Sequence, residues 1–254
     1  MKSNKRLILV GVAAFLLFLI VQTPAHLIFG LVANNLPLKV YGVNGSVWNG
    51  EIEQINVGRE SITGVQWSLH PSHLLMGRVA ADISASLGQR RINAYAARSI
   101  GGDIVLKNVS GRIDAQTLLG LLKIPALQLG GEFNFNLQSV VLDGKTPLEA
   151  QGRVLWSDAS SRFPQRLELG TLSAIVSTTD KGIQAELKDG GNGPLELNGD
   201  LTLTQKGDYD FNGVFASREG AQSMLGRSLN MMGRPNREGK VSVKNKGNLS
   251  ALGF

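Results

Sequence analysis

Apolar residues recur at every second position through most of the chain after residue 39. Phe133, Phe135 and Leu137 alternate with polar residues, and Leu195 and Leu197 follow the same pattern. Such alternation gives a strand one dry and one wet face, which is typical of an antiparallel sheet with one solvated side. Many of the 31 glycines fall between these runs, as turn residues do. We therefore predict a mainly β fold, a meandering antiparallel sheet whose dry face needs a cover.

A long apolar run at the N-terminus adds a second constraint. Lys2, Lys5 and Arg6 precede the unbroken run 7–21, and the apolar character resumes after a short polar break. A helix needs about 20 mostly apolar residues to cross a bilayer, so we predict a single transmembrane anchor at 7–25. Because the positive charges precede the span, the N-terminus is expected in the cytoplasm and the bulk of the chain on the far side.

A cleaved secretory signal is the alternative interpretation, because it also has a basic start and an apolar core. Its cleavage site needs small residues at the −3 and −1 positions before the cut. The segment from Val21 to Ala25 contains no such pair, and Pro24 lies where the peptidase would act. We therefore favour a retained anchor.

The anchor divides the chain into four segments. We predict a basic cytoplasmic flank at 1–6, the anchor at 7–25, an interfacial linker at 26–38 and a β domain at 39–254. Within the β domain, Gly45-Ser-Val-Trp-Asn-Gly is weakly similar to Gly152-Arg-Val-Leu-Trp-Ser. This similarity leaves open a division of the domain into two related halves, 39–129 and 130–254.

One short segment that breaks the alternation carries a helix-start signal. Residues 70–76 are predicted to form a helical turn, because Pro71 suits the first helical position, where its missing N–H costs no hydrogen bond. In this turn we expect Leu74 and Leu75 to point inward.

Two longer segments are also predicted to be short helices. Residues 114–123 have Asp114 at the position of an N-terminal cap, and residues 217–232 have Ser217 there. The second helix is expected to end at Gly233, because glycine commonly follows a helix C-terminus.

Catalysis has little support in the residue types present. Cysteine is absent, which removes thiol catalysis and cysteine-based zinc sites. His70 and His73 offer only two ligands, whereas a zinc site needs three or four. Asp208 and Asp210 flank Tyr209 and are expected to point outward from a strand. Nucleophile elbows, phosphate-binding loops and dinucleotide fingerprints are also missing. We predict no enzyme, with no catalytic residue, no metal and no cofactor.

The net charge of +6 reflects 26 lysines and arginines against 20 acidic residues, and the excess concentrates after Arg227. A basic tail of this kind can bind nucleic acid or acidic lipid, or it can be one solvated face of a strand. We favour the solvated strand face and expect no nucleic-acid partner, because this part of the chain is placed outside the cytoplasm.

Three tryptophans lie in or at the end of predicted strands. They are Trp48, Trp67 and Trp156. A buried tryptophan contributes strongly to a core, and its indole N–H then needs a hydrogen-bond partner. Packing is the favoured role for the three residues, and lining of an apolar binding groove is the alternative.

An ordered series of motifs along the chain resembles a known family. The series comprises residues 42–50 (GVNGSVWNG), 66–78 (QWSLHPSHLLMGR), 152–159 (GRVLWSDA), 193–201 (GPLELNGDL) and 232–243 (MGRPNREGKVSV). In this order the motifs are similar to those of the type II secretion system protein N family, over nearly the whole chain. The W-x-L-x-P-x-x-L-L-x-G-R stretch within 67–78 also resembles segments of AsmA-type envelope proteins.

The resemblance implies a non-enzymatic, inner-membrane accessory component of the machine that exports folded proteins from the periplasm across the outer membrane. Its partners would be other components of that machine and the inner membrane. The AsmA-like stretch implies a curved, taco-like sheet with an apolar interior. It therefore keeps open an alternative function, a periplasmic groove that binds lipid or another apolar ligand.

Overall fold

A single antiparallel sheet forms the body of the protein in the computed structural model, which describes residues 22–33, 39–58, 60–99, 102–122, 128–144, 146–162 and 165–248. The strands are β1 (Lys39–Gly45), β2 (Asn49–Val57), β3 (Glu60–Leu69), β4 (Arg78–Leu87), β5 (Arg90–Ser99), β6 (Ile104–Asp114), β7 (Leu129–Asp143), β8 (Thr146–Ser161), β9 (Leu167–Thr179), β10 (Gly182–Asp189), β11 (Leu195–Leu203), β12 (Asp208–Ser217) and β13 (Val241–Asn248). The helices are α2 (Ala25–Ala33), α3 (Pro71–Leu74), α4 (Ala115–Leu121) and α5 (Met224–Met232).

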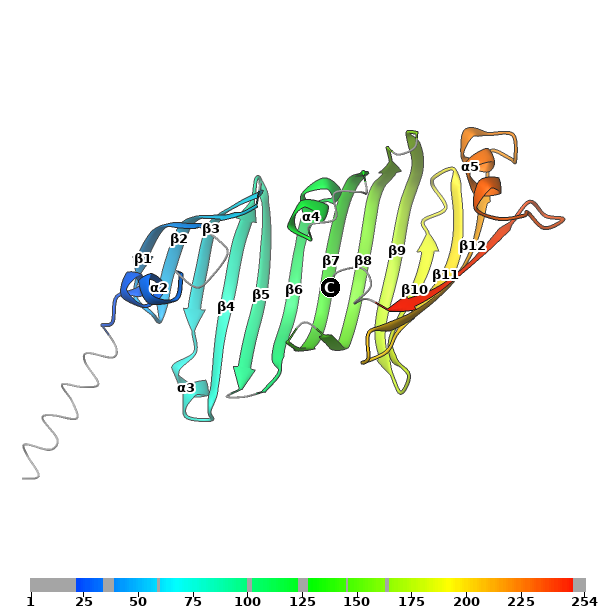
Figure 1. The fold of residues 1–254 in the computed structure, drawn as a ribbon. Helices are drawn as coiled ribbons and strands as arrows, with labels where there is room; N and C mark the ends of the chain where they lie inside the picture. The colour runs from blue at the N-terminus through cyan, green and yellow to red at the C-terminus, as the bar shows by residue number, and fades with distance from the viewer. Residues whose placement is uncertain are drawn as a thin grey trace, which may run out of the picture.

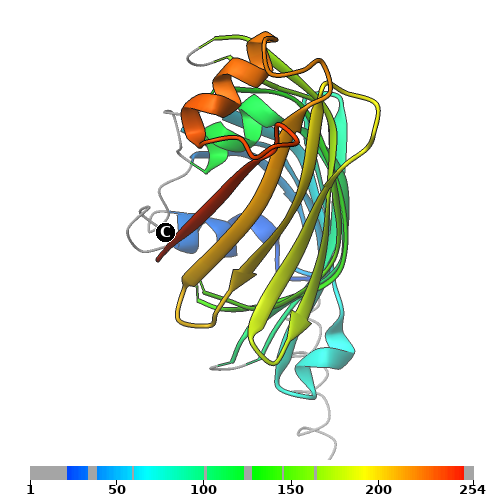
Figure 2. The same ribbon diagram turned by 90° about the vertical axis from the view of Figure 1, so that its right-hand side faces the viewer.

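Each strand pairs with the next strand in the sequence, so the sheet order runs from β1 to β13 without a crossover (Figure 1). The predicted mainly β, meandering antiparallel fold with a few short helices is therefore confirmed. The sheet is open, because β1 and β13 do not pair with each other. Figure 2 shows that the sheet is curved and that α2, α4 and α5 lie on its concave side.

The two faces of the sheet differ sharply in chemistry. Leu195 and Leu197 of β11 pack against Leu225 and Leu229 of α5, so the apolar side chains of the alternating strands face the concave side. The next residues along each strand point to the opposite, polar face, as the twofold side-chain period of a strand requires. The alternation of apolar and polar residues along the strands therefore separates a concave apolar face from an opposite polar face.

Local irregularities bend the strands. In β8, Asp158 has a positive φ of 50°, and the β8–β9 register shifts between Trp156 and Ala159. On β7, the other neighbour of β8, Gly131 has φ 94°, and a Cβ there would lie 2.4 Å from the carbonyl oxygen of Ser157. Extra residues of this kind increase local twist and bend a strand. They contribute to the curvature of a sheet that does not close.

The helical turn at 70–76 is confirmed as α3, which begins at Pro71. The expectation that Leu74 and Leu75 point inward is wrong, because these side chains are 44% and 92% exposed. The physical reason is that α3 joins the ends of β3 and β4, where no other described element packs over this single helical turn (Figure 1).

The helix predicted to follow Asp114 is confirmed as α4, but the Asp114 carboxylate makes no capping hydrogen bond. It instead accepts a hydrogen bond from Arg90 at 2.8 Å. For α5, the predicted start at Ser217 is wrong. Ser217 is the last residue of β12, and the cap is Ser223, whose hydroxyl accepts from the Gly226 N–H at 2.9 Å. The predicted end at Gly233 is confirmed.

The predicted basic flank at 1–6 lies outside the described residues, as does all but the last part of the predicted anchor at 7–25. Within the ranges that the structure describes, no helix is both long and apolar enough to cross a membrane. The predicted linker at 26–38 includes most of α2. The division into halves at 129/130 stays a prediction, and this boundary falls at the start of β7, which pairs with β6.

Candidate functional site

The apolar face is the first candidate site. One row of directly opposed residues crosses seven successive strands from β6 to β12, and it comprises Val109, Leu137, Gly152, Val176, Ala185, Leu201 and Phe211. The apolar side chains of this row are only half-buried. A continuous apolar strip that is left partly open is a feature of binding surfaces rather than of a closed core.

Helix α5 covers the apolar face over the last strands of the sheet, and α2 contacts Trp67 near the first strands. Leu195, Leu197 and Val241 form a buried cluster with two α5 leucines, and Phe215 packs against that cluster. Val241 is fully buried. The helix α5 therefore covers the last strands of the sheet, while the central row stays half-buried. The open length of this face could accommodate an elongated apolar group.

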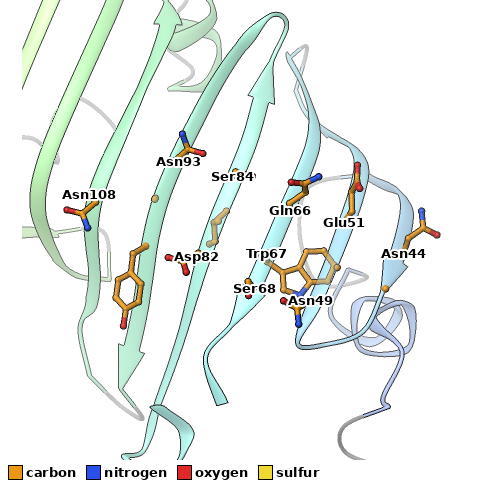
Figure 3. A pocket seen from close by; sticks show the side chains of 15 residues that line it. Asn44, Asn49, Glu51, Gln66, Trp67, Ser68, Asp82, Ser84, Asn93 and Asn108 are labelled. Carbon is orange, nitrogen blue, oxygen red and sulfur yellow. The ribbon is translucent and has the colours of Figure 1, made fainter. Parts of the chain in front are cut away.

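A second candidate is a hollow of about 700 Å³ over β1 to β6 (Figure 3). Asn44, Glu51, Gln66, Ser84 and Asn93 line it and lie directly opposite one another on five successive strands. Trp67, Ile83 and Tyr95 also line it, so the hollow offers apolar contact as well as amide and hydroxyl groups that can exchange hydrogen bonds with a ligand.

The two histidines of the H-x-x-H pair hydrogen-bond to different partners beside this hollow. His70 Nε2 lies 2.9 Å from an Asp82 carboxylate oxygen, and His73 Nε2 lies 3.2 Å from the Tyr95 hydroxyl. The His73 Nδ1 atom is buried and has no hydrogen-bond partner among the described residues. Across the same residues, no group of three or more histidine, aspartate or glutamate side chains is placed to hold a metal ion.

The three tryptophans do not form one site. Trp67 contacts Phe29 of α2 at a ring-centroid distance of 5.3 Å, and its indole N–H donates to the Val47 carbonyl at 2.9 Å. Trp156 stacks on Phe133 at 5.0 Å. Its N–H donates to a backbone carbonyl, that of Gly130, at 2.9 Å. Trp48 lies in the β1–β2 turn. A groove-lining role for these residues stays a prediction.

A charged cluster joins β5, β6 and β7. Arg90 donates to Glu132 at 2.7 Å and to Asp114 at 2.8 Å, and the hydrogen bond with Glu132 is the main reason that the Arg90 pKa is raised. No sequence pattern predicts this cluster, because its partners lie 42 and 24 residues from Arg90. Its position within the sheet points to a role in strand register.

A second cluster closes the β10–β11 connection. Burial raises the pKa of Asp189, but hydrogen bonds from the Leu197 N–H, the Arg218 guanidinium and the Gly191 N–H outweigh burial, and the net pKa is lowered. Arg218 also donates to the carbonyl of Leu195. This network ties the ends of β10, β11 and β12 together, and sequence spacing did not predict it.

Among the described strands, β1 and β13 form the two edges of the sheet. In the described part of the chain, β13 pairs with β12, apart from one bridge between Val241 and Pro235. Lys244 and Lys246 lie on β13, and Lys246 pairs with Asp210 at 2.7 Å, which lowers the Asp210 pKa. The predicted strand face therefore holds for Lys244 and Lys246, whereas Arg227 lies on α5 and Arg234 and Arg237 lie between α5 and β13. The remaining edge of β13 can accept a partner strand.

Comparison with known proteins identifies relatives over nearly the whole chain. A family model described as type II secretion system (T2SS), protein N matches residues 37–244. The type II secretion system protein N of Aeromonas hydrophila is 24% identical over 98% of this chain and 100% of its own length. The protein of the same name from Klebsiella pneumoniae is 26% identical, covering 95% of this chain and 94% of its own length. No solved structure matches this chain.

Proposed function

Because the chain belongs to the type II secretion system protein N family, we propose that it serves this machine as a non-enzymatic accessory component. Its role is to aid export of folded proteins across the outer membrane by holding other components of the system together. The basic flank and the apolar run 7–21 support an anchor in the inner membrane at 7–25. The β domain then lies in the periplasm.

The observation that carries this proposal is the open edge of the sheet. β13 keeps a regular register with β12 from Val241 to Asn248, and no other described strand covers its outer side. An exposed strand edge binds an extended segment of a partner through backbone hydrogen bonds. Lys244 and Lys246 discourage pairing with a second basic edge, so the expected partner segment is acidic.

Site-specific crosslinking in cells tests the scaffold role. A photoreactive residue is placed at Ser242 or Asn245 of β13, both exposed, and the protein is illuminated in cells whose secretion depends on it. We expect these edge positions to capture another secretion component, because a partner strand brings its backbone next to them.

The matched control is Asn198 in β11, an exposed residue of an interior strand that is already paired on both sides. It should give little or no crosslink to the same component. The proposal fails if no position on β13 or β1 captures a secretion component while secretion still requires the protein.

A second candidate function is binding of lipid or another apolar ligand along the apolar face. The half-buried row from Val109 to Phe211 specifically favours it, because an isolated sheet gains nothing by leaving such a strip open to water. Leu201 of this row shares the face of Leu197, which packs against α5, and Figure 2 shows α5 on the concave side of the sheet. A ligand there is shielded from several directions.

Two neighbouring residues of β9 give a matched test of ligand binding. Val176 lies on the apolar face, whereas Ile175 is 43% exposed and lies opposite Glu186 on the polar face. Mass spectrometry of the purified full chain should detect an apolar ligand that is lost in Val176→Asn and retained in Ile175→Asn. Equal ligand content in both variants, or a wild-type protein free of ligand, contradicts this function.

A further inference from the structure

The first described residues lie beside the turn that joins β1 to β2. The carbonyl of Thr23 accepts a hydrogen bond from the Val47 N–H at 3.1 Å, and Pro24 forms a bridge with Ser46. The carbonyl of Trp48 in turn accepts from the Leu69 N–H at 2.7 Å. The start of the described chain, the β1–β2 turn and the end of β3 therefore lie side by side. We call this the tether end, because the apolar run 7–21 immediately precedes it.

The helix α3 follows β3 directly and projects from the tether end (Figure 1). Its tip, which we define as Leu74, Leu75, Met76 and Val79, is strongly exposed. Leu75 is 92% exposed, Met76 65% and Val79 50%. Four large apolar side chains at the end of one hairpin form a convex point rather than a groove, so they are not shaped to receive a helix or strand of a partner.

Two cations flank the tip. Arg78 begins β4, and Arg98 of β5 lies directly opposite Val79. Neither guanidinium takes part in an ion pair with a described residue, whereas the nearby Asp82 is engaged with His70. An apolar tip with a basic collar matches a bilayer interface, where acyl chains accept the apolar groups and anionic headgroups lie at the level of the cations.

We propose that the α3 tip inserts into the surface of the same bilayer that holds the N-terminal anchor. This inference rests on the inner-membrane anchoring in the proposed function. Two attachment points, the anchor and the tip, then fix the orientation of the sheet. The strands rise from the membrane, and α4 and α5 are held at the far end (Figure 1). The curved apolar face opens along the bilayer rather than into it.

The absence of cysteine makes a direct test practical. Single variants Leu75→Cys and Met231→Cys are labelled with an environment-sensitive fluorophore in the full-length protein. Met231 is the matched control, because it is 86% exposed and lies on α5 at the opposite end. Both proteins are reconstituted in vesicles of phosphatidylethanolamine and phosphatidylglycerol, with and without lipids that carry a nitroxide quencher near the headgroup.

We expect the label at position 75 to shift to the blue and to be strongly quenched, and the label at 231 to stay solvent-like. Replacing Arg78 and Arg98 by glutamine should reduce the quenching at position 75 in anionic vesicles, because the collar then lacks its attraction for headgroups. Circular dichroism confirms that the variants remain folded.

Flotation of the vesicles tests the N-terminal anchor separately from insertion of the α3 tip. A protein that floats with the vesicles but keeps a solvent-like label at position 75 overturns the tip insertion and leaves the anchor intact. Equal quenching at 75 and 231 also overturns it, since the bilayer would then contact both ends. A protein that fails to float overturns the anchor, and the tip proposal falls with it.

Discussion

At the residue scale, Asp189 shows how one side chain holds three strands together. Its side chain is 11% exposed, and it accepts hydrogen bonds from two backbone N–H groups and from Arg218. A carboxylate in such a setting has a lowered pKa, although its partial burial acts in the opposite direction. The charged form is the form that stabilises the folded chain.

Replacing Asp189 by asparagine is expected to lower the free energy of unfolding by about 2 kcal/mol at neutral pH, since hydrogen bonds to a charged group are lost. The folded pKa is depressed, so the contribution of Asp189 is present above its unfolded pKa of about 4 and is lost as the pH falls through the folded value. Urea unfolding at pH 7 and at decreasing pH measures both effects.

Asp200→Asn provides the control for this measurement. Asp200 is exposed on the polar face of β11, and it has no hydrogen bond or ion pair to a described side chain. Its loss should change stability by no more than a few tenths of a kcal/mol. Equal losses in the two variants show that the Asp189 network contributes nothing particular.

Residues of this kind mark the limit of what the sequence predicts. Alternation placed Trp67 and Trp156 within strands, where the structure has them. The contacts of Arg90 with Glu132 and of Asp189 with Arg218 could not be predicted, because these partners are distant in the sequence and depend on a register that no local pattern encodes. Ion pairs between distant segments become visible only once the pairing of the strands is known.

At the element scale, the strands were predicted with greater success than the helix ends. A twofold period is repeated over many residues, and so it survives local exceptions. A helix start depends on one capping side chain, and two serines compete near α5. Ser217 continues the pairing of β12 with Leu195, and the helix therefore starts only after Ser223.

The corrected cap can be measured. Ser223→Ala removes the hydroxyl that accepts from the Gly226 N–H, and we expect it to destabilise the protein by about 1 kcal/mol. Hydrogen exchange within α5 should become faster, because the first turn frays. Ser217→Ala removes only a hydroxyl–hydroxyl contact with Ser223 and should have a smaller effect. A larger effect of Ser217→Ala would restore Ser217 as the cap.

The exposed α3 tip shows a different limit. Pro71 correctly indicated a helical turn, but a pair of leucines was assumed to point inward. Whether an apolar residue is buried depends on what lies across from it, and at the end of an open sheet there is no opposite layer. Exposure of Leu75 follows from the topology and not from its own hydrophobicity.

At the scale of the whole molecule, the sequence indicated the chemistry of the two faces but not the extent of the sheet. Alternation holds for a barrel, a sandwich and an open sheet alike. The continuity of β1 to β13, the lack of pairing between these two edges and the position of α5 over the last strands are tertiary facts. Bulges such as that at Asp158 bend the strands, and the resulting curvature helps to decide between a barrel, a sandwich and an open sheet.

The odd number of described strands has a consequence for where β13 ends. In a meander, successive strands reverse direction, so the first and the thirteenth run the same way. β1 runs toward the turn beside Thr23, and β13 therefore brings Asn248 back toward the level at which the chain came in. The two points are separated by roughly 60 Å along the sheet, at about 4.8 Å per strand. Inserting a β-hairpin would lengthen that distance and leave Thr23 and Asn248 at the same end of the strands. Adding a single strand would instead place Asn248 at the opposite end.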